Sequence, residues 1–242
     1  MTVGRLTRPG GTRGNAVPER PSNASVIVRS CLSRVLGLMA QRRIAGLEHI
    51  PLEGPCLLVF NQRSVFDTPL VSTLVPRPDV TGLVARDYAR NPFYRVLVEW
   101  GGGVWITRCS GDRGALDAAL GALARGWVVG ISPEGRRSRT GGLVEGKPGP
   151  AFLAKRSGAP VVPVAFTHTD RIAGSLARFR RTTVEIRIGA PFRLEPFGRG
   201  SHRAQLREDT DHIMCRIAAL LPPGERGAYA SHPYLEPKGA LA

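Results

Sequence analysis

Short apolar runs alternate along most of the chain with stretches in which apolar residues recur every three or four positions. The short runs are typical of buried strands, and the periodic stretches are typical of amphipathic helices. They predict strands at Cys56–Phe60, Val80–Val84, Val104–Ile106, Trp127–Ile131, Val161–Phe166 and Thr183–Ile188, and helices at Val26–Arg43, Thr68–Leu74, Pro92–Trp100, Arg113–Arg125, Pro150–Ser157 and His202–Leu220. Such alternation indicates a single α/β domain with a mixed, largely parallel sheet flanked by helices.

The two ends of the chain differ in composition from this middle part. Residues 1–22 are rich in Gly, Arg, Pro and Thr and offer almost nothing to bury, which predicts a disordered basic arm. Residues 223–242 are dense in Gly and Pro and are expected to form an irregular tail, in which Tyr229 and Tyr234 can pack back on the domain. The folded domain is therefore expected within residues 23–222.

The chain is strongly basic, with 34 Lys and Arg against 19 Asp and Glu and a net charge of +15. A field of this sign attracts phosphates, nucleotides, anionic lipid surfaces or an acidic carrier protein, although an arginine bias can equally reflect genome composition. The predicted helix at Val26–Arg43 is basic and amphipathic. It suits an anionic membrane surface, and it equally suits packing on the domain with its charges in water.

The cysteines and the hydropathy of the chain indicate the cellular compartment of the protein. The four cysteines are far apart and form no CxxC pair, so we expect neither a metal site nor a disulfide framework. No secretory signal is visible, and no run approaches the roughly 18 apolar residues of a membrane span. We therefore expect a cytoplasmic protein, either soluble or peripheral on the inner face of the membrane.

Polar residues follow two of the predicted strands, at the strand ends where α/β sheets usually carry their functional groups. The segment Phe60–Asp67 places Asn61, Gln62, Arg63 and Ser64 between a strand and a helix, and Asp67 is expected to cap that helix. The segment Gly101–Arg108 ends on Arg108, an arginine suited to a phosphate or carboxylate. Taken alone, the first segment is as well explained as a capped loop, and Arg108 as a solvated charge.

Two further segments follow the same pattern. Ser132–Arg139 gathers three arginines around one glutamate, and such like charges favour a bound anion over a free solvated loop. Glu134 is expected to hold one arginine while the others face a ligand. The prolines of Ala159–Val164 predict an edge strand or a bulge, and its apolar residues suit either the wall of an acyl groove or the core.

In order and spacing these segments resemble the glycerol-phosphate and lysophospholipid acyltransferase family, which has an HxxxxD block, a GxxFIxR block, an EGTRS block and a VPV segment. The corresponding residues here are Asn61–Asp67, Gly102–Arg108, Glu134–Ser138 and Ala159–Val164, and Gly46–Pro51 is similar to the family's first strand. The resemblance covers about residues 44–190 and implies a glycerolipid acyltransferase-like fold.

The resemblance also implies a reaction. The family's histidine acts as a general base on an acceptor hydroxyl that attacks an acyl thioester, and Asp67 would orient that base. Arg108 and Arg137 would bind the phosphate of the acceptor, while Glu134 would fix the third block. The donor would be acyl-CoA or an acyl-carrier protein, used as a co-substrate without a further cofactor or metal. The remaining substrate-binding candidates in these blocks are Asn61, Arg63, Ser64, Gly135, Arg136 and Ser138.

The chain departs from the family at the base itself, because Gln62 occupies the histidine position and Arg136 replaces the usual threonine. A carboxamide takes no proton near neutral pH, and loss of a general base typically costs about 10²–10⁴-fold in rate. Three interpretations remain open. The acceptor is already nucleophilic, such as an amine, with Gln62 assisting the oxyanion; or the protein binds lipid, CoA or carrier without turnover; or an original histidine was replaced by design.

Other candidates are weaker. His168 is the one residue placed to serve as an alternative base, although a lone histidine is more often structural or solvated. Nucleic-acid binding lacks a recognition motif, and a nucleotide enzyme lacks a phosphate-binding glycine loop. We therefore expect acyl transfer from a thioester donor to an anionic hydroxyl or amine acceptor, with an inactive binding protein as the alternative.

Overall fold

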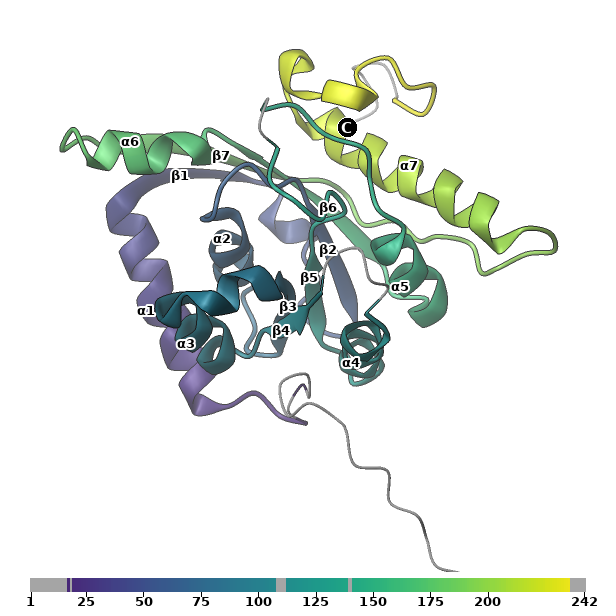
Figure 1. Cartoon of the computed structure of the whole chain (residues 1–242), viewed down its shortest axis with the longest axis horizontal. Coiled ribbons are helices and arrows are strands. Elements are labelled where there is room, and N and C mark those ends of the chain that lie inside the picture. Colours follow the sequence, from purple (N-terminus) through teal and green to yellow (C-terminus); the bar gives the residue numbers. More distant parts are fainter. Residues whose placement is uncertain (1–16, 18, 108–111, 139–140, 236–242) are drawn as a thin grey trace, which may run out of the picture.

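The computed structural model describes residue 17 and residues 19–107, 112–138 and 141–235. These residues form a seven-stranded sheet with the order β1-β7-β6-β2-β5-β3-β4 (Figure 1). Its strands are β1 (Ala40–Ala45), β2 (Cys56–Phe60), β3 (Val80–Ala85), β4 (Val104–Ile106), β5 (Val128–Ile131), β6 (Val161–Thr167) and β7 (Thr182–Ile188). Neighbouring strands run parallel except β6 and β7, which are antiparallel. The predicted mixed, largely parallel sheet is confirmed.

Helices cover both faces of this sheet. They are α1 (Asn23–Met39), α2 (Asp67–Leu74), α3 (Pro92–Gly101), α4 (Arg113–Ala124), α5 (Gly149–Ser157), α6 (Ile172–Leu176) and α7 (His202–Leu220). In Figure 1, α1, α2 and α3 lie on one side of the strands, and α4, α5 and α7 lie on the other. The helices on each face bury their apolar residues against the strands, so that both faces of the sheet are shielded from water.

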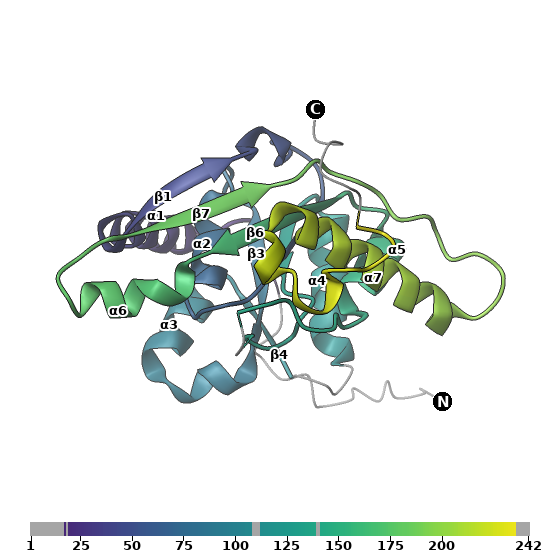
Figure 2. The same cartoon turned by 90° about the horizontal axis from the view of Figure 1, so that it is seen from above.

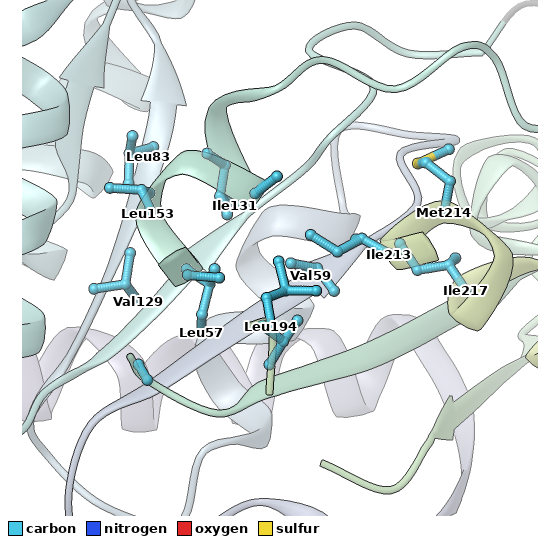
Figure 3. Close-up of a cluster of buried hydrophobic side chains, with 14 of the residues drawn as sticks. Leu57, Val59, Leu83, Val129, Ile131, Leu153, Leu194, Ile213, Met214 and Ile217 are labelled. Carbon is cyan, nitrogen blue, oxygen red and sulfur yellow. The ribbon is translucent and has the colours of Figure 1, made fainter. Parts of the chain in front are cut away.

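Two apolar clusters fill the space between these layers, and β2 contributes to both. Leu57 and Val59 pack toward α4, α5 and α7, a cluster shown in Figure 3, whereas Leu58 and Phe60 pack toward α1 and α2. Successive side chains of a strand point to opposite faces, so an uninterrupted apolar run is buried on both sides. This double burial fixes β2, and with it the polar segment that follows Phe60, at the centre of the molecule.

Two expectations about the N-terminal part of the domain are wrong. The predicted helix at Val26–Arg43 ends at Met39, and its last residues begin the edge strand β1, which pairs with β7 alone. The strand expected at Gly46–Pro51 is instead a 3-10 helix at Leu47–His49, entered through Gly46 at a positive φ of 81°. The edge position of β1 explains the first difference, because only Ala40 of this strand is buried and its sequence therefore lacks the apolar pattern of a buried strand.

The prolines of Ala159–Val164 do not mark an edge, because β6 pairs with β2 on one side and with β7 on the other. Pro163 lies just before the ladder to β7, which begins at Val164, so its missing N–H falls outside that ladder. The whole strand is buried. The segment is therefore core, as its second interpretation held, and not the wall of an open groove.

Candidate active site

The first block is anchored to β6 through Asn61. Its side-chain amide donates to the carbonyl of Phe166 over 3.0 Å and accepts from the N–H of the same residue over 2.7 Å. Asn61 is buried, so both of its polar groups are engaged by backbone. This contact fixes the point at which the block leaves β2 and turns across the carboxyl ends of the strands.

Gln62 joins the first block to the third. Its backbone N–H donates to Oε1 of Glu134 over 2.8 Å, and its carbonyl accepts from the N–H of Ser138 over 2.9 Å. The side chain is nearly buried and lines two cavities that meet at this residue. The two backbone bonds fix the position of Gln62 between these cavities.

Asp67 does not cap α2 as the sequence suggested. It is the first residue of the helix, and its Oδ2 accepts from the backbone N–H groups of Arg63 and Ser64, both over 2.6 Å. Burial raises the pKa of this carboxyl to about 6, against the opposing effect of those N–H donors and of the nearby Thr169 hydroxyl. Oδ1 has no hydrogen bond of standard geometry. The carboxyl of Asp67 is therefore enclosed by the loop that follows Gln62 and by the hydroxyl of Thr169.

Glu134 bridges two loops with both of its oxygens. Oε1 accepts from Gln62, and Oε2 accepts from the N–H of Val144 over 3.0 Å. The residue is buried, and this burial raises its pKa to about 7; the negative charge of Asp67 raises it further, and the two N–H donors oppose the shift. Glu134 holds backbone rather than an arginine, and so fixes the third block by a different contact from the one expected.

Arg63 connects the first block to other segments of the chain. Its guanidinium donates to the carbonyl of Gly141 over 2.9 Å and forms ion pairs with Glu225 (2.5 Å) and Asp170 (3.3 Å). The side chain is only 11% exposed, so these partners surround it. The residue ties the first block to the C-terminal segment, and its guanidinium is thus already engaged by protein groups.

The third block places its arginines at the surface. Arg136 and Arg137 are exposed, and neither has an ion-pair partner among the residues that the structure describes. Gly135 turns the chain at a positive φ of 64°, and the hydroxyl of Ser138 donates to the carbonyl of Gly142 over 2.5 Å. Arg108, the arginine expected from the second block, lies outside the described residues.

Two cavities with different linings meet beside Gln62. The larger, about 860 Å³, carries Glu134, Arg136 and Lys147 on its wall. The smaller, about 100 Å³, is mainly apolar and lies between α1, α2, α3 and β3. Besides Gln62, the residues that line both are Phe60, Thr68, Val84 and Tyr88. A larger chamber that carries cations on its wall therefore adjoins a smaller apolar one at Gln62.

Two residues near this site were not found from the sequence. Lys147 is exposed on the wall of the larger cavity, where its backbone N–H donates to the carbonyl of Pro133 over 2.7 Å. Ser132 lines the same cavity, with a buried hydroxyl oxygen that lacks a partner. Lysine is rare in this chain, which was the one available signal for Lys147. His168, the alternative base, follows β6 in a left-handed turn and lines neither cavity.

A model of the Acyltransferase family matches residues 41–167, which is more than half of the 242 residues. The chain belongs to this family. The match includes the first block and the third, whose geometry around Gln62 and Glu134 is given above. The fold and the family implied by the sequence are confirmed.

Named relatives lie at moderate distance. A Caenorhabditis elegans protein named "Putative 1-acyl-sn-glycerol-3-phosphate acyltransferase acl-2" is 27% identical over 148 residues, 60% of this chain and 52% of that protein. The 1-acyl-sn-glycerol-3-phosphate acyltransferase of Borreliella burgdorferi is 27% identical over 149 residues, 60% of this chain and 59% of that enzyme. The chain therefore spans little more than half the length of these relatives.

One solved structure shares the fold. The 1-acyl-sn-glycerophosphate acyltransferase PlsC of Thermotoga maritima superposes with a TM-score of 0.59 at 23% identity, over 78% of this chain and 76% of that one. At this identity the likeness concerns the arrangement of helices and strands alone. Within the described ranges, none of the helices has the length and apolar character that crossing a membrane requires.

Glu134 predicts a distinct pH dependence of stability. Its pKa of about 7 exceeds the ordinary value of 4.5, so the folded state holds more protons than the unfolded state between those values. Its contribution is therefore favourable at pH 4 and is lost as the pH rises toward 7, by about 3 kcal/mol for a shift of this size. Denaturant unfolding of the wild type and of Glu134→Gln from pH 4 to 8 measures this difference. Parallel pH profiles would contradict the shift.

Proposed function

We propose that this chain transfers an acyl group from a thioester donor, acyl-CoA or an acyl-carrier protein, to a hydroxyl or amine of an anionic acceptor. The observation that carries the proposal is the junction at Gln62 of an apolar chamber with one that bears arginine and lysine. An acyl chain needs the first and an anionic acceptor needs the second, and the carbonyl that reacts must lie between them.

The reaction at this junction requires attack of the acceptor on the thioester carbonyl, followed by cleavage of the C–S bond and release of the thiol. The side-chain N–H of Gln62 can donate to the oxyanion that develops on the carbonyl oxygen. A neutral amine attacks without prior loss of a proton, so it needs no imidazole. The buried carboxylate of Asp67 is the group that can then accept the proton.

The third block supplies the positive charges that are expected to bind the anionic group of the acceptor. Arg136 lines the larger cavity and Arg137 is exposed beside it, so both guanidinium groups are free to bind a phosphate. Lys147 adds a third cation on the same wall. Among the relatives named above, two are named for an acceptor of this kind, a glycerol phosphate that carries one acyl chain.

Replacing Arg136 or Arg137 with alanine is expected to raise the KM for a phosphate-bearing acceptor about tenfold or more, because a charge-assisted hydrogen bond contributes roughly 1.5–3 kcal/mol. The assay follows thiol release from acyl-CoA and from an acyl-carrier donor with lysophosphatidate and with amine acceptors. Arg199→Ala, at an exposed arginine outside the blocks, is the matched control. An unchanged KM in both third-block variants would contradict the proposal that Arg136 and Arg137 bind the phosphate of the acceptor.

A second candidate function is binding of the same ligands without turnover. The observation that favours it is the absence of histidine from the described walls of both cavities. Retention of acyl-CoA or an acyl-carrier protein, with no thiol released in the presence of any acceptor, would identify the chain as such a binding protein. Turnover with Gln62 in place would exclude it.

An anionic membrane surface is a further proposed partner, and α1 is the element that supports it. The helix buries Leu36 against the domain, and the guanidinium of Arg29 donates to carbonyls at the end of α2. Its other face leaves Ile27, Val35 and Leu38 in solvent. A helix packed on one face and apolar on the other suits an interfacial position.

A further inference from the structure

The turn that joins α6 to β7 carries an aromatic residue, Phe179, whose side chain does not pack against the rest of the described protein. Phe179 is 101% exposed, the full exposure of an isolated side chain. The turn around it is well defined, because the N–H groups of Arg178 and Arg180 both donate to the carbonyl of Ser175, and that of Phe179 donates to Leu176. The ring is therefore held outward by an ordered backbone.

The backbone at this position is strained for such a residue. Phe179 has a φ of 55°, in the left-handed region that costs an L-residue roughly 1–2 kcal/mol and that glycine adopts freely. A phenylalanine that is both strained and unburied contributes nothing to folding that a glycine would not. Strain of this kind, where the surrounding structure does not use the side chain, is a reason to look for a function.

The residues on either side of Phe179 are basic. Arg178 and Arg180 are exposed and have no ion-pair partner within the described part of the chain. Arg181 instead donates to the carbonyls of Gly37 and Ala40 at the end of α1, which fastens the turn to that helix. The tip, defined here as Arg178, Phe179 and Arg180, is thus one aromatic ring between two free positive charges.

The tip projects beside the C-terminal end of α1, which carries another exposed apolar side chain. In both views it forms the outermost point of the molecule on the side where α1 and α3 also lie (Figures 1 and 2). Leu38, beside the Gly37 carbonyl that Arg181 binds, is 74% exposed, whereas the exposed Trp100 of α3 lies toward the other end of α1, where Gly101 and Gly102 approach Val28 and Ser25. These side chains stand on separate elements and form no groove, so a deformable surface fits them better than a rigid protein partner.

We propose that the tip inserts Phe179 into the interface of an anionic bilayer, with Arg178 and Arg180 on the phosphates of the lipid head groups. An aromatic ring favours the region between head groups and acyl chains, and arginines beside it are attracted to a negative leaflet. Because Arg181 joins the tip to α1, insertion would orient the helices that border the smaller, apolar cavity toward the lipid. The inference concerns docking and is independent of whether the chain transfers an acyl group.

Sedimentation with vesicles tests the proposal. Wild-type protein is expected to sediment with phosphatidylcholine vesicles that contain about one third phosphatidylglycerol, and much less with phosphatidylcholine alone. Phe179→Gly is expected to lower partitioning about tenfold, because the buried part of the ring is lost. Replacing Arg178 and Arg180 with glutamine is expected to lower it about fivefold for each charge at low salt.

The controls separate the tip from general effects. Leu52→Ser removes a side chain that is 72% exposed before β2, at the opposite end of the strands from the tip, and Arg199→Gln with Arg203→Gln removes two exposed charges near the start of α7. Both are expected to bind like wild type. Phe179→Gly adopts the left-handed backbone without strain, so its Tm should not fall. Equal binding of wild type and Phe179→Gly, or no sedimentation of the wild type, would overturn the proposal, the latter pointing to an acidic protein partner.

Discussion

Replacing Gln62 with histidine is expected to raise kcat/KM for acyl transfer to a hydroxyl acceptor by about 10²–10⁴-fold, the usual contribution of a general base. The rest of a base-and-carboxylate pair is in place. Asp67 is buried, and the loop between the two residues is fixed by the bonds from Arg63 and Ser64 to its Oδ2. An imidazole at position 62 would therefore find a buried carboxylate available to orient it.

The measurement compares thiol release by wild type, Gln62→His and Gln62→Asn with lysophosphatidate and with amine acceptors. Gln62→Asn is the matched control, because it keeps a carboxamide and gains no base. Asp67→Asn in the histidine background should remove most of the gain, since the imidazole then loses its orienting carboxylate. An equally active wild type with the amine would instead assign the site to an acceptor that needs no base. No gain with either acceptor would contradict the catalytic role of position 62.

Replacing Glu134 with alanine is expected to lower the free energy of unfolding by about 4 kcal/mol, since two N–H groups lose their acceptor at roughly 1–3 kcal/mol each and a cavity remains. For a domain of this size the Tm should fall by roughly 10 °C. Activity or ligand binding should be lost as well, because Gln62 and Val144 are no longer held together.

Glutamine at position 134 is the informative comparison. Its amide oxygen can replace one acceptor, but its NH₂ faces the second N–H donor, so about half of the loss should remain. Glu195→Ala, at an exposed carboxylate outside the site, should change the free energy of unfolding by less than about 0.5 kcal/mol. Thermal and denaturant unfolding measure all three variants. A stability of Glu134→Ala equal to that of the Glu195 control would show that the bridge contributes little.

The contacts of Arg63 and Asn61 could not be predicted from the motif in which these residues stand. Both stand in the first block and were expected to bind substrate, yet Asn61 is engaged by the backbone of Phe166, and Arg63 by Glu225 and Asp170. Their partners lie more than a hundred residues away along the chain. Spacing within a block locates a loop, but it does not say which side chains face inward and which secure the loop.

The C-terminal segment makes the same point. Its composition predicted an irregular tail in which Tyr229 can pack back on the domain, and Tyr229 is buried; the bond from the N–H of Leu143 to the carbonyl of Glu225 was not foreseen. Gly227 approaches Leu143 so closely that a side chain there would collide with its carbonyl oxygen. These contacts support the third block from outside the region matched by the family. Nothing in the local pattern of glycines and prolines encodes them.

The sequence by itself determined the α/β class, six of the strands, the family and the glutamine at position 62, because apolar period and block order are local properties of the chain. Only the tertiary structure decided that Glu134 bridges backbone, that Arg63 is enclosed, and that Lys147 joins Arg136 on one wall. It alone showed that Phe179 stands strained and fully exposed. The physical reason is that ion pairs, hydrogen bonds and burial depend on which distant segments of the chain come into contact, and these contacts cannot be read from the local pattern of a single sequence.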